Sequence, residues 1–449
     1  MHLHLIPVIR QIKQNVARHL SSEAIESVCR QAGHRWRERT LGPVATLHAF
    51  LLQILHGNTA CTHVSRLLNA VFTAGAYCQA RCRLPLVVFE RLLERTTQAA
   101  QGGAGDSRWR GHRTFLTDGS SFSMPDTPAL QRHFGQPGKQ RVGCGFPVAH
   151  LLALFDARRG LLLKVQALPL RTNDMSQIQA LHDALLPNDV LVADRGFSSY
   201  MHLALLFQRK IHAVFRVHQR QLVSFRRDRK LTGKRPRGTI ALYAKSRLVR
   251  KLARFDQIVE YTKPVIRPLW ISAADYAALP GTLQVRELRY WTKHRGYRTR
   301  RVTLVTTLVD PEAYPQEELA ALYGRRWEVE TNLNHLKTTM GLNVLHCETV
   351  AGVLKELMMF ALIYNLVRLV MGAAAERQGV AVQRISFIDA LRWLAQARTG
   401  DLLPILQLVP HRPHRVEPRA IKRRPKPYHV LTRPRHELRK ALKENNVAA

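Results

Sequence analysis

The sequence predicts a mixed α/β core that is interrupted by a β-rich insertion and preceded by a helical N-terminal domain. Three observations support this fold class. Apolar residues recur at helical spacing near the start, strand-like runs then alternate with helical patterns, and a later stretch is both basic and strand-like. We therefore expect a helical domain at 1–105, the two parts of the core at 106–215 and 305–400, the insertion at 216–304, and a basic tail at 401–449.

The composition of the 449-residue chain points to a folded protein with a polyanionic partner. Its hydrophobic content of 46% argues against disorder, and 69 Lys and Arg against 32 Asp and Glu leave a formal charge of +37. A charge of this size repels itself unless a partner neutralises it. Nucleic acid is therefore the leading partner, and a membrane surface is disfavoured because no long basic amphipathic helix stands out.

We expect a cytoplasmic protein without a membrane span. Basic residues interrupt the apolar start where a signal peptide needs a continuous apolar region. The most apolar run, residues 356–375, contains Asn365 and Arg368, so it predicts a buried helix. The six cysteines are few and scattered, without two pairs at zinc-site spacing, and we expect reduced thiols rather than a metal site.

The N-terminal domain is predicted to consist of consecutive helices. Residues 21–33 begin with serines suited to capping, and residues 44–57 repeat apolar residues at helical spacing up to a glycine. Residues 61–72 are either the second helix of a DNA-binding helix-turn-helix or one arm of an ordinary helical hairpin. The Gly-rich, polar stretch at 98–113 marks the boundary of this domain, for which we expect a role in DNA binding.

The core is predicted to start with strands and helices in alternation. A short strand is expected to end near Asp118, and the residues around Gly160 predict a hairpin turn between two further strands. An amphipathic helix, a short strand that stops at Asp194, another helix and a strand at 211–217 follow. This order predicts a mixed sheet.

Two aspartates occupy equivalent positions in this core. Asp118 and Asp194 each follow an apolar strand and precede a glycine, in the sequences FLTDG and LVADRG. A carboxylate placed there projects into the crevice where α/β sheets bind ligands. Taken singly, each is equally readable as a turn residue.

One predicted helix, residues 322–342, carries a third candidate carboxylate. Its residues Tyr323, Arg326, Glu330 and Lys337 fall on one face of an ideal helix. Such a face is either a solvated surface with a Glu/Lys pair or a functional site. The same helix has an apolar stripe for packing, formed by Leu322, Val329, Leu333, Leu336 and Met340.

The combination of carboxylates is more informative than any one of them. Carboxylates from two strands and a helix can hold two divalent metal ions about 4 Å apart, which stabilise the attacking and leaving oxygens of a phosphodiester displacement. On so basic a chain, the set Asp118, Asp194 and Glu330 predicts metal-dependent chemistry on nucleic acid.

The insertion and the tail are also predicted to meet nucleic acid. Trp270, Tyr290, Trp291 and Tyr297 lie among many Arg and Lys residues, a mixture suited to stacking on bases beside phosphate contacts, although simple strand packing explains each aromatic equally well. The tail is rich in Pro and Arg and is predicted to be either a mobile arm on DNA or a solubilising extension.

The stretch YGRRWEVETNLNHLK, residues 323–337, matches the pattern Y-x2-R-x3-E-x6-K. In this signature, and in the flanks TDGSS and VADRGF of its two aspartates, the chain resembles the DDE transposases of bacterial insertion sequences, in the insertion sequence 4 group. The resemblance implies a ribonuclease H-like core with a β-rich insertion between the second Asp and the Glu, which agrees with the insertion expected at 216–304.

The resemblance also implies roles for the site residues. Asp118, Asp194 and Glu330 would hold two Mg²⁺ ions, with Mn²⁺ as a substitute and no small-molecule cofactor. Arg326 and Lys337 would contact DNA phosphates. The partners would be double-stranded DNA of the element ends and of the target, bound by a homodimer on the bacterial nucleoid. Tyr323 would help to position the DNA strand. We also expect Trp291, with Trp270 as the alternative, to stack on a flipped base.

Two rival functions remain at this point. One is a catalytically inactive DNA-binding relative that acts as a repressor or architectural factor, and the other is a nuclease that cuts without joining. Clustered carboxylates argue against the first, because they repel phosphate unless metal intervenes. The function that the sequence favours is cut-and-paste DNA transposition.

Overall fold

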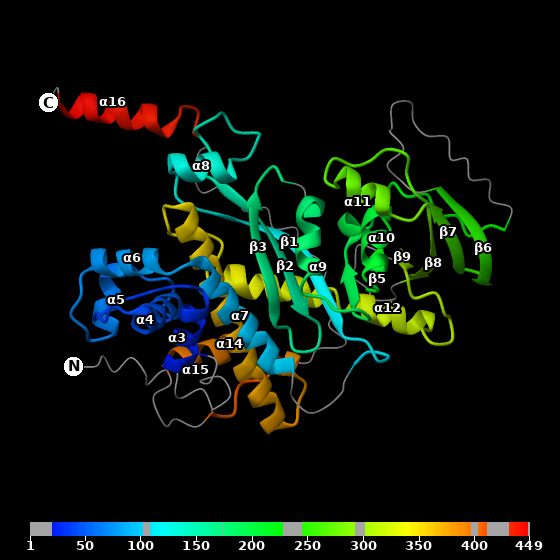
Figure 1. The fold of residues 1–449 in the computed structure, drawn as a ribbon, viewed down its shortest axis with the longest axis horizontal. Coiled ribbons are helices and arrows are strands. Elements are labelled where there is room, and N and C mark those ends of the chain that lie inside the picture. The colour runs from blue at the N-terminus through cyan, green and yellow to red at the C-terminus, as the bar shows by residue number, and fades with distance from the viewer. Residues whose placement is uncertain are drawn as a thin grey trace.

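Within the residues that the structure describes, one sheet of nine strands runs through the molecule, with helices on both of its faces (Figure 1). In this computed structural model the strand order is β3-β2-β1-β4-β5-β9-β8-β7-β6. The structure describes residues 20–101, 108–172, 174–227, 245–291, 301–396, 403–410 and 431–447. The strands are β1 (Thr114–Ser123), β2 (Val148–Asp156), β3 (Leu162–Pro169), β4 (Val190–Ala193), β5 (His212–Arg216), β6 (Lys245–Ala253), β7 (Asp256–Thr262), β8 (Thr282–Trp291) and β9 (Arg301–Thr306).

Helices gather into a lobe at one end of the sheet (Figure 1, lower left), whereas the other end of the sheet carries shorter helices. The helical lobe combines α3–α6 from the N-terminal region with α14 and α15 from the C-terminal half. The helices are α3 (Ser22–Gln31), α4 (Pro43–Leu55), α5 (Cys61–Leu67), α6 (Ala74–Arg83), α7 (Leu86–Gln101), α8 (Pro128–Phe134), α9 (Ile178–His182), α10 (Tyr200–Gln208), α11 (Ala273–Ala278), α12 (Gln316–Gly324), α13 (Trp327–Asn334), α14 (Val350–Gln378), α15 (Phe387–Gln396) and α16 (Arg435–Val447).

The two faces of the sheet belong to two hydrophobic clusters. Successive residues of a strand point to opposite faces, and the neighbours Phe115 and Leu116 of β1 accordingly enter different clusters. Leu116 packs with residues of the N-terminal helices and α14, while Phe115 packs with residues of α9 and α10. The N-terminal helices therefore share a core with the C-terminal half of the chain.

Strand β1 is longer than predicted, and the expectation that it ends near Asp118 was wrong. It continues to Ser123, and Asp118 lies mid-strand, opposite Ala153 of the antiparallel strand β2. The residues after Asp118 have low strand propensity, but hydrogen bonding along the nine-residue β2 holds them extended. What does end at this point is the pairing with the parallel strand β4, whose last pair joins Thr117 to Ala193.

The predicted hairpin between β2 and β3 is confirmed. The two strands pair antiparallel, and Gly160 in their turn has a φ of +69°. A side chain at Gly160 would be strained by that backbone and would also meet the guanidinium of Arg368 from α14.

The basic region at 216–304 is rich in strands, as expected. Strands β6, β7 and β8 pair antiparallel, and β9 joins them to β5, so that they extend the same sheet. Strand β9 crosses the boundary that we placed at residue 304. Tyr297 lies outside the described residues, as do residues 401–402, 411–430 and 448–449 of the tail. The division into domains stays a prediction.

Helix α14 is long and apolar enough to cross a membrane, but 83% of its most apolar window is buried inside the protein. Asn365 within it is fully buried and bonds the backbone of Leu162 through both its amide oxygen and its amide nitrogen. The prediction of a buried helix is confirmed, because packing against both sheet and N-terminal helices accounts for its apolar surface.

The helix predicted at 322–342 is divided into three pieces. Helix α12 ends at Gly324, α13 starts at Trp327, and the turn at His335–Thr339 is a π-helix. The apolar stripe is nevertheless buried as expected, with no member more than 7% exposed. The prediction of one continuous helix was wrong, because at the bend the N–H groups of Arg326 and Glu328 donate to carbonyls three residues back, as in a tight turn.

Candidate active site

The parallel register of β1 and β4 brings the two candidate aspartates to the same edge. Thr117 and Ala193 form the last parallel pair, so Asp118 and Asp194 are the next residue on each of two adjacent strands. After Asp194 the chain turns at once into a short 3₁₀ helix, Arg195–Phe197. The carboxyl ends of parallel strands are where such sheets bind ligands.

Arg326 connects this edge to the candidate glutamate. Its guanidinium donates to a carboxylate oxygen of Asp118 at 3.4 Å and to one of Glu330 at 2.8 Å. The Arg326 side chain is 12% exposed, whereas those of Asp118 and Glu330 are 24% and 42% exposed. One half-buried cation thus neutralises two carboxylates that come from a strand and a helix.

The environment of Asp118 favours its protonated form. Burial raises the pKa of Asp118 to about 6, and the negative charges of Asp194 and Glu330 add to this effect. The backbone N–H of Gly119, which donates to Asp118 at 2.8 Å, and the charge of Arg326 act in the opposite direction. The raised pKa of Asp118 therefore reflects burial first and the neighbouring carboxylates second.

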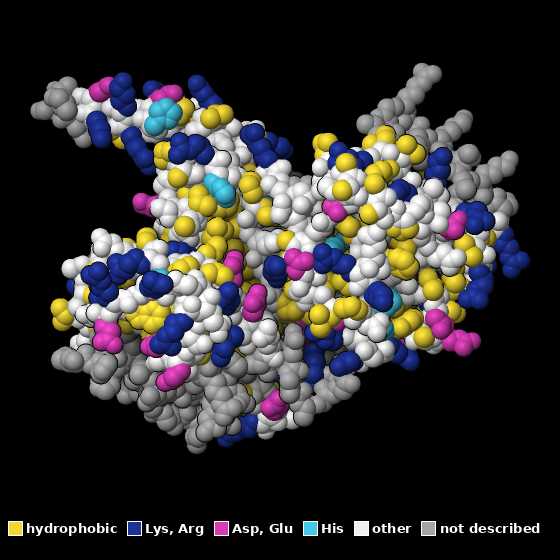
Figure 2. Space-filling model, in the orientation of Figure 1, with side chains coloured by type: hydrophobic (Ala, Val, Ile, Leu, Met, Phe, Trp, Pro, Cys, Tyr) yellow, Lys and Arg dark blue, Asp and Glu magenta, His cyan; other side chains and the backbone are white. Residues whose placement is uncertain are grey.

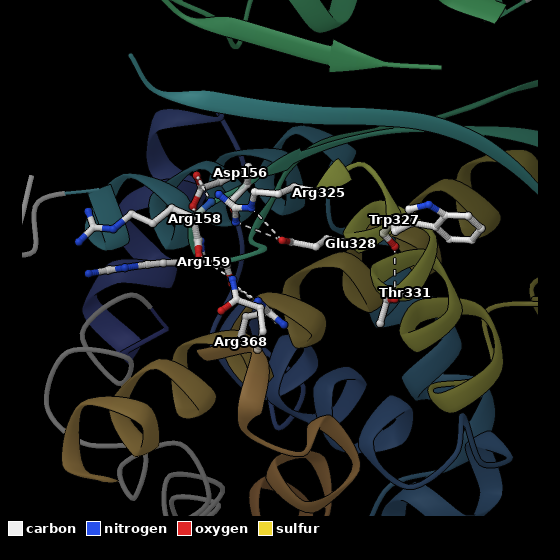
Figure 3. Close-up of polar contacts among 10 residues, drawn as sticks. Asp156, Arg158, Arg159, Arg325, Trp327, Glu328, Thr331 and Arg368 are labelled. Atoms are coloured by element: carbon white, nitrogen blue, oxygen red, sulfur yellow. Dashed lines mark hydrogen bonds and ion pairs between the residues drawn. The ribbon is translucent and has the colours of Figure 1, made fainter. Parts of the chain in front are cut away.

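The bend before α13 is fastened to the β2–β3 hairpin (Figure 3). Arg325 donates to the backbone carbonyl of Ala157 in that hairpin and to Glu328, whose carboxylate oxygen lies 2.8 Å from Arg325 Nε. The hairpin is itself held by Asp156, which accepts from the N–H groups of Arg158 and Arg159 in its own turn. These contacts hold the bend against the hairpin directly before Arg326, whose guanidinium reaches Asp118.

The chain after α13 stays beside β1. Lys337, in the π-helical turn, donates to the hydroxyl of Ser120 at 2.8 Å, and burial lowers the pKa of Lys337. Further on, the N–H of Ser123 donates to the carbonyl of Asn343 at 2.9 Å. π-Helical turns occur often at functional sites. Lys337 therefore contacts β1 at Ser120, two residues after Asp118 and on the same face of the strand.

The aromatic candidates differ in exposure. Tyr323 is 7% exposed and packs in the core, and burial raises its pKa to about 12. Trp291 is 47% exposed at the end of β8, with its ring edge-on to Phe255 at 4.7 Å. Trp270 packs partly against a hydrophobic cluster. Tyr323 thus lies buried beside Arg326, as the helical wheel grouped them, although it does not face solvent. Of Trp270 and Trp291, Trp291 is the more accessible.

Comparison with known families now adds to this geometry. The family model described as "Transposase DDE domain" matches residues 109–366, more than half of the chain. The chain belongs to the DDE transposase family. The matched range includes Asp118, Asp194 and Glu330 together with all of the elements that carry them.

The resemblance to the insertion sequence 4 group is confirmed. This transposase is 26% identical over 387 residues to the transposase InsG of insertion sequence element IS4 from Escherichia coli strain K12, an alignment that covers 80% of this chain and 79% of InsG. Among solved structures, the piggyBac transposase synaptic complex with hairpin DNA matches with a TM-score of 0.47 and 10% identity, covering 87% of this chain and 80% of that one.

Behind Asp194 the transposase has a buried histidine pair that sequence reasoning missed. His182 of α9 and His202 of α10 are fully buried, and their Nε2 atoms lie 3.0 Å apart. Burial lowers the pKa of His202 to about 4, so the ring is neutral and its Nδ1–H donates to the carbonyl of Phe197 at 2.8 Å. His182 must then be the donor within the pair. The pair supports the turn that follows Asp194, and no spacing in the sequence signals it.

The side chains at the edge are of the types that bind a divalent cation, but their present arrangement does not form a metal site. Within the described part of the transposase, no three carboxylate, imidazole or thiol groups lie close enough to share one metal ion. Carboxylate oxygens are nonetheless the ligands that Mg²⁺ prefers, and Asp118 has two further carboxylates, Asp194 and Glu330, near enough to raise its pKa in addition to the larger effect of burial. Glu330 is exposed enough to turn without disturbing the core. The donor set therefore fits a divalent metal once Arg326 releases it.

Proposed function

We propose that this transposase binds the terminal inverted repeats of its element as double-stranded DNA, nicks them by metal-dependent hydrolysis, and joins the freed 3′-OH to target DNA. The observation that carries the proposal is the shared edge at which Asp118 and Asp194 end the β1–β4 pairing while Arg326 links Asp118 to Glu330. Both reactions are phosphoryl transfers and can use one site.

In this proposal Asp118, Asp194 and Glu330 hold two Mg²⁺ ions, for which Mn²⁺ substitutes. When bound, the ions supply charge for the attacking and leaving oxygens of the phosphodiester. The chain's own contribution is to bring the three carboxylates to one place from two strands and a helix. Their supports are fixed by the sheet register and by the Arg325 contacts described above.

Arg326 exchanges partners as DNA binds. A guanidinium presents a planar fork that suits a phosphate as well as a carboxylate. When a phosphate takes the donors of Arg326, Asp118 and Glu330 lose their internal counter-ion and become available to metal. Substrate binding and completion of the site are then one event.

Lys337 and the aromatics act on the DNA strand. Lys337 is a point charge two positions along β1 from Asp118, held there by Ser120. Tyr323, buried beside Arg326, positions the strand indirectly by supporting that arginine. Trp291, being exposed, is the residue that stacks on an unpaired base, a role the half-buried Trp270 is less free to take.

The proposal extends to fold and assembly. Strands β1–β5 form a ribonuclease H-like core, the strand-rich region at 216–304 is its insertion, and the helices up to residue 101 form a DNA-binding domain. A homodimer assembled on DNA would process two ends together, on the nucleoid in the bacterial cytoplasm. These assignments follow the family resemblance.

The test is cleavage of labelled DNA that carries the element's end, with Mg²⁺ or with EDTA, by wild type and by Glu330→Gln. The substitution keeps the shape of the side chain and removes its charge, so we expect nicking to fall by about 10³-fold or more while DNA binding persists. Glu317→Gln, which removes an exposed carboxylate from the neighbouring helix α12, is the matched control and should cleave like wild type.

Other outcomes of this experiment are equally clear. Tight binding by wild type without cleavage under any metal condition would replace the proposal with a non-catalytic DNA-binding protein. Nicking without joining, in an assay supplied with target DNA, would identify a nuclease.

A further inference from the structure

A second basic site lies in the N-terminal helices, at a pocket of about 210 Å³. The loop between α3 and α4 and the end of α6 form its walls. Four arginines line it, and its described lining includes neither Asp nor Glu: these are Arg35, Arg37, Arg39 and Arg83. Lys and Arg side chains also gather over this lobe in the space-filling view (Figure 2).

The loop exposes most of its charged side chains. Arg35, Arg37 and Arg39 are exposed, as is Glu38, whereas His34 and Trp36 are half-buried. The pocket lining includes the three arginines but not Glu38. The loop is therefore held to the protein by its aromatic residues and presents arginines to the pocket.

Trp36 anchors this loop. Its ring packs against the hydrophobic core, His34 stacks on it with a centroid distance of 5.8 Å, and the guanidinium of Arg30 lies over it at 5.6 Å. Because protein groups already occupy the ring, it does not serve as a platform for a base. The recognition elements left in the pocket are guanidinium groups.

Within the described residues, none of the four arginines makes an ion pair with a carboxylate, unlike Arg326 at the carboxylate edge. The charge of Arg83 also lowers the pKa of His34, after the larger effect of burial. Four guanidiniums around one pocket repel one another until an anion binds. The pocket is smaller than the roughly 300 Å³ at which small-molecule sites begin, which suits a single phosphate group.

We propose that this pocket, the Arg37–Arg83 pocket, binds a backbone phosphate of the transposase's DNA. This inference rests on the proposed function in one respect, that DNA is the partner. The pocket would give the N-terminal helices a DNA contact that depends on charge and not on base sequence. Bidentate hydrogen bonding from arginine to phosphate supplies the attraction. The contact would hold DNA at a place separate from the carboxylate edge.

The salt dependence of DNA binding tests this proposal. A labelled duplex carrying the element's end is titrated in EDTA with wild type, with Arg37→Gln/Arg83→Gln, and with Arg209→Gln/Arg392→Gln, which removes two exposed arginines elsewhere. The pocket holds one phosphate, so losing it makes the plot of log affinity against log salt shallower by about 0.9. Between 50 and 200 mM salt the pocket variant should lose about 3.5-fold less affinity than wild type.

The controls separate the possible results. The Arg209/Arg392 variant should keep the wild-type slope, and Arg37→Lys/Arg83→Lys should regain it, since the slope reports charge contacts. A pocket variant that keeps the wild-type slope, or a lysine variant that does not recover it, overturns the inference. Failure of the proposed function is a distinct result, because wild type would then bind the duplex without nicking it when Mg²⁺ is added.

Discussion

Two arginines in this transposase pair with carboxylates in contrasting ways. In the part of the sheet formed by β6–β9, here called the sheet extension, Arg286 of β8 and Asp256 of β7 form a two-bond pair, with Arg286 Nε 2.8 Å from an Asp256 oxygen. Their side chains are 1% and 5% exposed, and Arg286 also donates to the carbonyl of Tyr314 at 2.6 Å. At the carboxylate edge, Arg326 divides its donors between Asp118 and Glu330, which remain partly exposed.

The difference teaches what each pair can do. Breaking a buried pair in which every guanidinium nitrogen is hydrogen-bonded is strongly destabilising, because each charge would be left without a partner or solvent. A cation shared between two half-exposed carboxylates can trade partners, because water and a ligand can reach the groups that are released. We infer that Asp256 has a structural role and that Asp118 and Glu330 are held ready for another cation.

The largest expected effect breaks the buried pair. Asp256→Ala leaves Arg286 as an uncompensated buried charge and should lower the free energy of unfolding by about 3–5 kcal/mol. Urea denaturation followed by circular dichroism measures this. Arg247→Ala, which removes an exposed partner of Glu260 in the same extension, is the control and should change stability by about 1 kcal/mol or less. Equal losses in both variants would contradict the distinction.

Removing the charge of Asp118 is expected to have the opposite effect and to raise the free energy of unfolding. Its pKa is raised to about 6 in the folded chain, above the ordinary value of 3.8, so the folded state binds the proton more tightly. The associated stability is complete below pH 4 and is lost as pH rises through about 6. Asp118→Asn cannot titrate, so in EDTA it should match wild type near pH 4 and exceed it by about 2 kcal/mol above pH 7.

Urea denaturation across this pH range measures the effect, with Asp256→Asn as the comparison. That substitution should destabilise at every pH in the range, because its partner is buried and stays charged. If Asp118→Asn were also destabilising at neutral pH, Asp118 would be a structural ion-pair partner like Asp256.

The candidate site shows which features could be predicted from the sequence. The strand-end position of Asp194 and the family signature around Glu330 are local patterns; in the structure Asp194 directly follows β4, and Glu330 lies on α13 with Arg326 between it and Asp118. The length of β1 was not predictable, because β2, a strand 30 or so residues away, holds it extended. The bend at Arg325 depends on the carbonyl of Ala157, far off in sequence, and the His182–His202 pair depends on two helices meeting. The catalytic role of the carboxylates stays a prediction.

A smaller effect is expected from removing the shared cation. Arg326→Gln should tighten binding of Mn²⁺ to the DNA-free transposase by about 5–10-fold, because the carboxylates no longer have an internal competitor. Electron paramagnetic resonance of free Mn²⁺ measures this without any need for catalysis. Arg209→Gln removes an equal charge from the surface and should leave Mn²⁺ affinity unchanged. Weaker binding in Arg326→Gln would show that the arginine organises the carboxylates instead of occupying them.

The smallest expected effect distinguishes the charge of Lys337 from its placement beside strand β1. Lys337→Gln removes one cation from the edge and should make the salt dependence of DNA binding shallower by about 0.9. Ser120→Ala keeps that cation but removes the hydroxyl to which Lys337 donates. It should therefore keep the wild-type slope while nicking slows several-fold, since a displaced phosphate contact impairs alignment more than attraction. Two results would contradict this role: a changed salt dependence in Ser120→Ala, or nicking that neither substitution affects. Either would mean that Lys337 is a structural cation like Arg286 and not a substrate-binding cation like Arg326.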